Sequence, residues 1–183
     1  RPKMAHSPAI LKQIAIATGK HEISANVSYG VCMAESNMDP LAARHEDNYR
    51  WLYHPSKVKP AGCSMTTEIV LQKTSMGLMQ VMGAVYRELG FRGWLSEVFY
   101  DTGIQLEYGC RHLRAKFQRF GFFEGLLAYN SGTPRLKADG QYVNFQYART
   151  VAQHVQQARE DGLFPASDDR HVTWLSDELT RKN

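Results

Sequence analysis

Apolar residues in this chain recur at intervals of three and four, and no segment alternates convincingly at a period of two. The first spacing places apolar side chains on one face of an α-helix, whereas a half-buried strand needs the second. The sequence therefore predicts a mainly α fold. We expect any sheet to be no more than a small hairpin, for which the loop at residues 53–67 offers a place.

Six segments carry the helical spacing, and residues with capping or turn chemistry bound them. Ser7, followed by a proline, suits a helix start, Asp101 or Thr102 suits another, and Gly90 suits a left-handed helix end. Residues 54–66 hold two prolines and a glycine, so we expect a long loop there. The expected helices cover about residues 8–19, 23–35, 80–89, 102–120, 122–128 and 148–161. Their apolar stripes predict core positions at Ile10, Leu11, Ile14 and Ala15 in the first of these helices, at Leu106, Cys110, Leu113 and Phe117 in the fourth, and at Ala148, Val151, Ala152, Val155 and Ala158 in the last. The last twenty residues are polar and predict a docked terminal helix or a frayed end.

The chain carries a formal net charge of +4, from 22 Lys and Arg against 18 Asp and Glu. A mild excess of base suits attraction to an acidic polymer, such as a cell wall whose stem peptides carry carboxylates. Nucleic acid is the rival polyanion, but the basic residues are scattered and no DNA-reading motif is present, so we expect no nucleic-acid partner. A solvated basic surface with no partner is the plain alternative.

The length of 183 residues favours one compact domain with little more than a tail beside it. No run of about 18 apolar residues is present, so we expect no membrane span. The first residues precede no apolar segment, and no secretory signal is visible. Both Met4 as the natural start and a trimmed front stay open. We expect a monomer.

Cys32, Cys63 and Cys110 are isolated cysteines. An odd count without a Cys-x-x-Cys spacing favours neither a disulfide framework nor a zinc site. Seven histidines are spread along the chain without His-Glu-x-x-His or a ligand pair at helical spacing. We therefore expect no metal and no cofactor.

Three short blocks place polar or ionisable side chains at the ends of apolar segments. They are Ala34-Glu35-Ser36-Asn37, Ser75 to Met82, and Leu127-Ala128-Tyr129-Asn130-Ser131-Gly132. Glu35 directly follows an apolar helical face, which predicts partial burial. Burial raises a carboxyl pKa, as a general acid near neutral pH requires. The alternative is an exposed Glu at a helix end.

The other two blocks suit contacts with a ligand and equally suit a structural role. Gly77 lets the backbone pass close to a ligand, while Met79 and Gln80 offer an adaptable apolar contact and a two-way hydrogen bond at the start of a helix. Tyr129 and Asn130 end a buried helix, where a phenol and an amide can hold a carboxyl group or a sugar amide. Each block alone is as readily explained by buried packing or by satisfied loop backbone groups.

Together, the order and content of the three blocks resemble the soluble lytic transglycosylase family and its goose-type lysozyme relatives. The family pattern is a helix-ending Glu-Ser, then Gly-Leu-Met-Gln, then Ala-Tyr-Asn-x-Gly, around a glycan groove, and the resemblance covers roughly residues 23–160. It implies that Glu35 is the catalytic acid, that Tyr129 hydrogen-bonds its carboxyl group, and that Asn130 contacts substrate or braces its loop. It implies further substrate contacts around the scissile bond from Ser75, Gly77, Met79 and Gln80.

The resemblance also implies a division of the chain. A helical segment (1–22) would precede a catalytic domain (23–162) with the goose-type, lysozyme-like helical fold, and a tail (163–183) would follow it. The interval between the acid and the glycine motif is longer than in compact members of the family. We therefore expect residues 45–74 to form an inserted lobe over one edge of the groove.

Two further segments, Tyr49-Arg50-Trp51-Leu52 and Gly83-Ala84-Val85, look most like enzymes of bacteriophages and prophages. The resemblance implies action on the cell wall, in the periplasm or outside the cell. A phage endolysin, a virion-borne lysin and a bacterial remodelling enzyme are all compatible with it.

The reaction that the resemblance implies needs only one carboxylate. The N-acetyl carbonyl of the muramic sugar attacks C1 while Glu35 protonates the leaving oxygen, and Glu35 then takes the proton of the C6 hydroxyl as a 1,6-anhydro ring closes. Goose-type hydrolases place an acidic residue two positions after the Gln of their motif, where this chain has Met82. Water activators for hydrolysis would have to come from Asp39, Glu46, Asp47 or Glu68, and Glu68 is the best placed of these in the sequence.

Two other function classes stay open. The first is a non-catalytic, glycan-binding part of a phage tail. This hypothesis predicts the groove but does not explain why the acid is retained. A cysteine hydrolase would use Cys63 with His45 or His54, yet no flanking signature accompanies that thiol.

Overall fold

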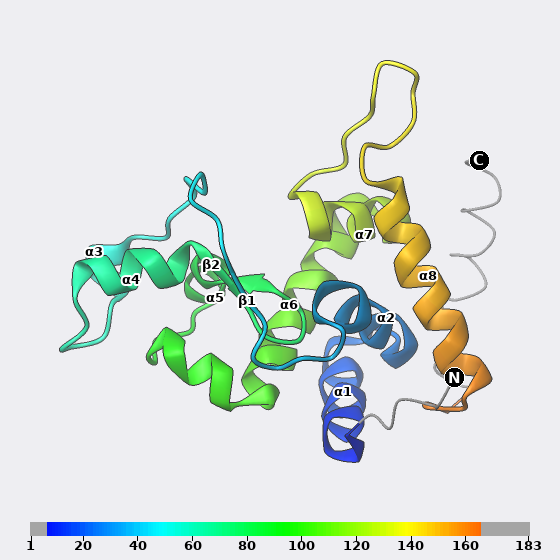
Figure 1. Ribbon diagram of the computed structural model, residues 1–183, viewed down its shortest axis with the longest axis horizontal. Helices are drawn as coiled ribbons and strands as arrows, with labels where there is room; N and C mark the ends of the chain where they lie inside the picture. The colour runs from blue at the N-terminus through cyan, green and yellow to red at the C-terminus, as the bar shows by residue number, and fades with distance from the viewer. Residues whose placement is uncertain (1–6, 166–183) are drawn as a thin grey trace. The chain divides into compact units, whose positions relative to one another are not determined.

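The computed structural model describes residues 7–165, which form helices and one small sheet (Figure 1). The α-helices are α1 (Pro8–His21), α2 (Ala25–Ser36), α3 (Pro55–Val58), α4 (Met65–Gln72), α5 (Gly83–Glu88), α6 (Thr102–Phe120), α7 (Phe122–Ser131) and α8 (Phe145–Glu160). A 3-10 helix, η1 (Leu95–Tyr100), precedes α6, and the strands are β1 (Ala43–His45), β2 (Thr74–Met76) and β3 (Val81–Met82). The predicted mainly α fold is confirmed.

The chain divides into two compact units. The described residues up to Ala34 and from Cys110 onward form the first, and Glu35–Gly109 form the second. The boundary falls inside α2 and inside α6, so that Glu35 and Ser36 belong to the second unit. None of the helices within residues 7–165 combines the length and the apolar character that a bilayer crossing needs. The prediction for the last twenty residues lies almost wholly outside the described residues.

The first unit is a helical core around α2. Every residue from Ala25 to Cys32 is buried, so this helix is covered on all sides and not on one face alone. Gly30 allows the close approach of α8, because a Cβ there would lie 2.8 Å from Val155 Cγ2 and 2.9 Å from the carbonyl oxygen of Val151. Helix α7 also packs against α8.

The apolar stripes predicted the later helices well. The predicted core positions of α6 and α8 are buried with the exception of Ala152, which is half-buried, and Asp101 caps α6 by accepting hydrogen bonds from the amides of Gly103 and Ile104 at 2.8 and 3.1 Å. Helix α1 forms as expected but continues to His21, and Ser7 makes no side-chain cap bond. Its buried face was predicted wrongly at one position: Ala15 is exposed. The buried positions in α1 are Ile14, Ala17 and Thr18.

The second unit contains a three-stranded antiparallel sheet in the order β1-β2-β3. Its hairpin, β2–β3, lies at residues 74–82, so the suggested place within 53–67 was wrong. The expected loop at 54–66 contains α3 and the start of α4 instead. The expected helix from Gln80 begins only at Gly83, because Gly77 and Gln80 have φ angles of 75° and 47°, which cannot continue a right-handed helix.

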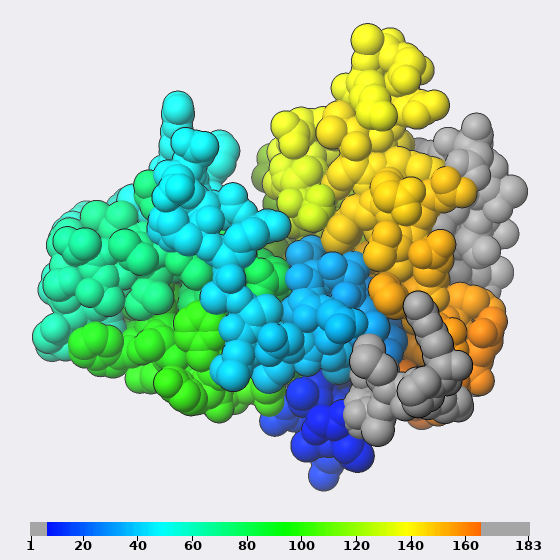
Figure 2. Space-filling view, in the orientation of Figure 1, coloured from blue at the N-terminus to red at the C-terminus, as the bar shows by residue number. Residues whose placement is uncertain are grey.

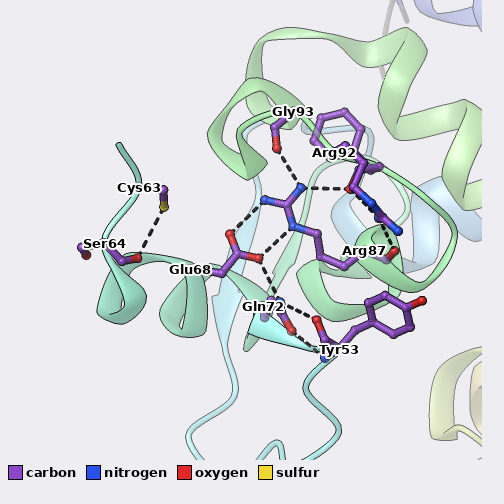
Figure 3. Close-up of polar contacts among 9 residues, drawn as sticks. Tyr53, Cys63, Ser64, Glu68, Gln72, Arg87, Arg92 and Gly93 are labelled. Carbon is purple, nitrogen blue, oxygen red and sulfur yellow. Dashed lines mark hydrogen bonds and ion pairs between the residues drawn. The ribbon is translucent and has the colours of Figure 1, made fainter. Parts of the chain in front are cut away.

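A buried ion pair joins α4 to α5 (Figure 3). Arg87 Nε and Nη2 donate to the two carboxylate oxygens of Glu68 at 2.8 and 2.9 Å, and Arg87 Nη1 donates to the carbonyl oxygens of Phe91 and Gly93. Gln72 Nε2 donates to Glu68 Oε1 at 2.9 Å. Burial raises the pKa of Glu68, but the hydrogen bonds from Arg87 and Gln72 and the charge of Arg87 outweigh this effect and hold that pKa below its usual range. The pair is therefore charged at neutral pH.

Arg87→Met should lower the free energy of unfolding by about 3–5 kcal/mol, because it leaves the buried Glu68 carboxylate without its partner. Urea unfolding measures the loss. The control is Arg114→Met, which breaks the exposed pair of Arg114 and Glu22 at 3.3 Å and should cost less than about 1 kcal/mol. Equal losses in the two variants would contradict the importance of the buried pair.

Candidate active site

Glu35 lies at the C-terminal end of α2, in the second unit, and is half-buried. The helix ends sharply one residue later, because Asn37 and Met38 both take left-handed φ angles, 53° and 64°. The carbonyl oxygen of Ser36 accepts a hydrogen bond from the amide of Asp39 at 3.1 Å. This carboxyl group therefore stands on a rigid helix end, followed directly by a tight turn.

A second turn, residues 77–80, connects β2 to β3 and is tied to that helix end. The Ser36 hydroxyl donates to the carbonyl oxygen of Leu78 at 2.8 Å. Within the turn, the amide of Gln80 donates to the carbonyl oxygen of Gly77 at 3.2 Å. The amide of Gly77 donates to the carbonyl oxygen of Ala42, just before β1, at 2.8 Å. The structure thus brings the Glu-Ser block and the Gly-Leu-Met-Gln block together.

Gln105, in the first turns of α6, is a residue that the sequence did not single out. It is fully buried, and its Oε1 accepts from the amide of Leu78 at 2.8 Å. Its Nε2 donates to the carbonyl oxygens of Pro40 at 2.9 Å and Val98 at 2.7 Å. One amide side chain therefore fixes both the loop after Glu35 and the turn. Only its position beside the buried stripe of α6 could have drawn attention to it.

The polar side chains of the turn already bond within the protein. Gln80 Oε1 accepts from the Ser75 hydroxyl at 2.8 Å, and Gln80 Nε2 donates to the carbonyl oxygens of Ala42 and Gly77, each at 3.0 Å. Ser75 is 2% exposed, and the Met79 side chain is fully buried. These contacts show Ser75, Met79 and Gln80 shaping the turn. Their predicted contact with a sugar stays a prediction.

Tyr129 and Asn130 lie near the end of α7, in the first unit. The half-buried Tyr129 ring packs against His112 with a centroid separation of 5.3 Å. Burial, with the nearby charge of Lys116, lowers the pKa of His112 to about 4, so this imidazole is neutral at pH 7. Asn130 is exposed, and its Oδ1 accepts from Asn144 Nδ2 at 3.3 Å. The predicted roles of Tyr129 and Asn130 stay predictions.

The four carboxylates considered as water activators all interact within the chain. Glu68 is wrong for that role, because it is 1% exposed and committed to Arg87. Asp39 Oδ1 accepts from the amide of Leu41 at 2.9 Å, Glu46 pairs with Arg44 at 2.7 Å, and an oxygen of Asp47 lies 3.3 Å from His45 Nε2. Met82, at the position where the resemblance predicts an acid in the hydrolases, lies on β3.

The three cysteines are free and buried. Cys63, expected on a loop, is 4% exposed and its thiol donates to the carbonyl oxygen of Ser64. This burial disfavours Cys63 as a nucleophile. Within residues 7–165, no three His, Cys, Asp or Glu side chains are grouped as a metal site requires.

Comparisons with known proteins give one match. A family model described as "Transglycosylase SLT domain" matches residues 12–151 of the chain. Searches of curated proteins and of solved structures found no match. The matched range includes Glu35, the turn at 77–80 and Tyr129.

Gly77→Ala should destabilise the protein by about 2–5 kcal/mol. The residue has φ 75°, and a Cβ there would lie 2.8 Å from Gln105 Cγ and closer still to its amide, so strain and overpacking add. The control is Gly140→Ala, at φ 81° with no atom within 4 Å of the new Cβ, which should lose only about 1–2 kcal/mol of strain. Thermal unfolding of both variants measures the difference. Similar losses would show that the contact with Gln105 does not require glycine.

Proposed function

The chain belongs to the transglycosylase SLT domain family, and on that premise we propose that it cleaves the β-1,4 bond between N-acetylmuramic acid and N-acetylglucosamine as a lytic transglycosylase. The mainly helical structure agrees with the lysozyme-like fold of the family, and membership supports a peptidoglycan-cleaving role. The proposal adds the catalytic residue, Glu35, and the product, a 1,6-anhydro sugar.

The observation that carries the proposal is the hydrogen bond from Ser36 to Leu78, 2.8 Å long. It fixes the residue next to Glu35 against the turn at 77–80, so the backbone that carries the Glu35 carboxyl group keeps a set position relative to that turn. A general acid must stand within hydrogen-bond reach of the atom that it protonates, and positions of this precision come from rigid elements.

In the proposed reaction Glu35 acts first as an acid. The acetamido oxygen of the muramic sugar bonds to C1 while the glycosidic C1–O bond breaks, and the Glu35 proton passes to the leaving oxygen. Glu35, now a carboxylate, then accepts the proton of the C6 hydroxyl as that oxygen bonds to C1 and the acetamido oxygen leaves. One carboxyl group suffices for both steps, and it ends in its starting state.

The carboxylates of the second unit favour this lyase reaction over hydrolysis. Hydrolysis requires a base that activates water, and the best sequence candidate, Glu68, is buried against Arg87. The C6 hydroxyl belongs to the sugar itself, so it competes with water at a very high effective concentration. Hydrolysis by a goose-type lysozyme is the second candidate function, because Asp39, Glu46 and Asp47 remain outside the core.

We further propose that the turn supports the substrate mainly through its backbone. Ser75 and Gln80 hold the turn in place, Met79 packs beneath it, and Gly77 leaves room for the Gln105 amide on the buried side of the turn. The partner is then the glycan strand of peptidoglycan, and the place of action is the cell wall. A phage origin and a monomeric state stay predictions.

Incubation with purified sacculi should release muropeptides that end in 1,6-anhydro-N-acetylmuramic acid. These products are one water lighter than the products of hydrolysis, and mass spectrometry separates the two. In solvent enriched in ¹⁸O no label should enter the products, because no water takes part in the reaction.

The control is Glu35→Gln, which is nearly isosteric but has no acidic proton to donate. It should keep the unfolding midpoint of the wild type and lose about 10²–10⁴ in rate or more. Reducing ends that carry ¹⁸O as the main product would show hydrolysis. A Glu35→Gln variant that keeps more than about a tenth of the rate would contradict the assignment of the acid.

A further inference from the structure

Residues 46–54, which we name the aromatic strap, join β1 to α3 in the second unit. In the space-filling view this part of the chain, in cyan, stands out from the surface of that unit (Figure 2). Trp51 is 75% exposed, and its ring meets the half-buried Tyr49 ring edge to face, with centroids 5.5 Å apart and planes at 72°. The strap therefore presents an indole ring to solvent.

Both ends of the strap are fixed. At its start the amide of Glu46 donates to the carbonyl oxygen of Lys73 at 2.9 Å. Near its end the amide of Tyr53 donates to Gln72 Oε1 at 2.7 Å, and Gln72 Nε2 donates back to the carbonyl oxygen of Tyr53 at 3.1 Å (Figure 3). Gln72 is fully buried and also bonds Glu68, so the Glu68–Arg87 ion pair anchors the strap through Gln72.

The strap is continuous with the candidate active site. The carbonyl oxygen of Ala42, just before β1, accepts from the amide of Gly77 and from Gln80 Nε2. Three residues of β1 then lead to Glu46, the first residue of the strap. The turn and the aromatic strap are therefore held by one continuous stretch of chain, which runs from Ala42 through β1 to Glu46.

The charges of the strap suit an anionic polymer. Its two carboxylates interact locally, Glu46 with Arg44 at 2.7 Å and Asp47 with His45 at 3.3 Å. Arg50, between the two rings in the sequence, is exposed and makes no ion pair with any residue in the range 7–165. Peptidoglycan carries carboxylates on its stem peptides, so an exposed cation beside the ring attracts it.

We propose that the aromatic strap is a glycan-binding subsite, in which Trp51 stacks on the apolar face of a pyranose ring and Tyr49 orients the indole. This inference rests on the proposed function, which supplies the glycan strand as substrate. A ring that is large, rigid and already exposed binds with little ordering cost, because the backbone on both sides of it is fixed before the ligand arrives.

The test measures co-sedimentation with purified sacculi in the Glu35→Gln background, where no cleavage disturbs the equilibrium. Adding Trp51→Ala should weaken binding about tenfold, and Trp51→Phe, which keeps an aromatic ring, should lose clearly less. The matched control is Tyr100→Ala, which removes a ring that is 89% exposed in the same unit but outside the strap and should leave binding unchanged. Urea unfolding midpoints of the variants should match that of their Glu35→Gln parent, because the side chains of Trp51 and Tyr100 are largely exposed.

Two outcomes overturn the inference. The first is that Trp51→Ala binds sacculi as tightly as its Glu35→Gln parent. The second is that Tyr100→Ala weakens binding as much as Trp51→Ala does, because this result would indicate that any exposed aromatic ring adheres to sacculi. If the wild type still releases anhydro-muropeptides in either case, the proposed function stands without this subsite. If the Glu35→Gln parent does not bind sacculi and the wild type releases no muropeptide, both the proposed function and the proposed subsite are wrong.

Discussion

One hydrogen bond, from the Ser36 hydroxyl to the carbonyl oxygen of Leu78, joins the end of α2 to the turn between β2 and β3. Two buried or half-buried amide side chains, Gln105 and Gln80, also hold these two segments in place. Gln105 bonds the turn on its buried side and the loop after α2 at Pro40, while Gln80 closes the turn onto Ala42. Because buried polar groups must be paired, a shift of either segment would break several bonds at once. The position of Glu35 is therefore a property of the whole second unit.

The Glu68–Arg87 pair extends this rigidity away from the turn. Taking both charges out of water is costly, and well-packed apolar residues of similar volume would stabilise the unit equally well. An apolar pair, however, would offer no hydrogen-bond partner to Gln72. The Gln72 amide bonds Glu68, accepts from the backbone amide of Tyr53 and donates to the carbonyl oxygen of Tyr53. The pair therefore gives this part of the second unit a defined geometry and, through Gln72, fixes the segment that carries Trp51.

The sequence predicted the long helices because their apolar stripes are local. Leu113 and Phe117 in α6, and Val151 and Val155 in α8, are buried as their spacing required. The turn at 77–80 was predicted as a helix start, since Leu78, Met82 and Val85 follow a helical spacing. Strands of two and three residues are too short to show an alternating pattern. Only the φ angles of Gly77 and Gln80 distinguish the hairpin.

The misjudged role of Glu68 has a different cause. Its position in the first turn of α4 is typical of an exposed acid, and its partner lies 19 residues further along the chain. Gln105 escaped notice for the same reason, because it bonds segments far from it in sequence. Long-range pairing of polar groups leaves no trace in local spacing. The motif residues Glu35, Gly77 and Tyr129 could be selected, in contrast, because three ordered blocks matched one family pattern.

The most direct test of the coupling between the helix end and the turn is kcat on sacculi for Ser36→Ala, compared with Ser64→Ala. Ser64 caps α4 through a 3.0 Å bond from the amide of Thr67, so its loss costs about 1 kcal/mol, comparable to the loss of the Ser36 bond. If the Ser36 bond positions Glu35, Ser36→Ala should lower kcat by about tenfold to a hundredfold, while Ser64→Ala keeps the kcat of the wild type at a similar stability. Equal kcat values for the two variants would contradict the account.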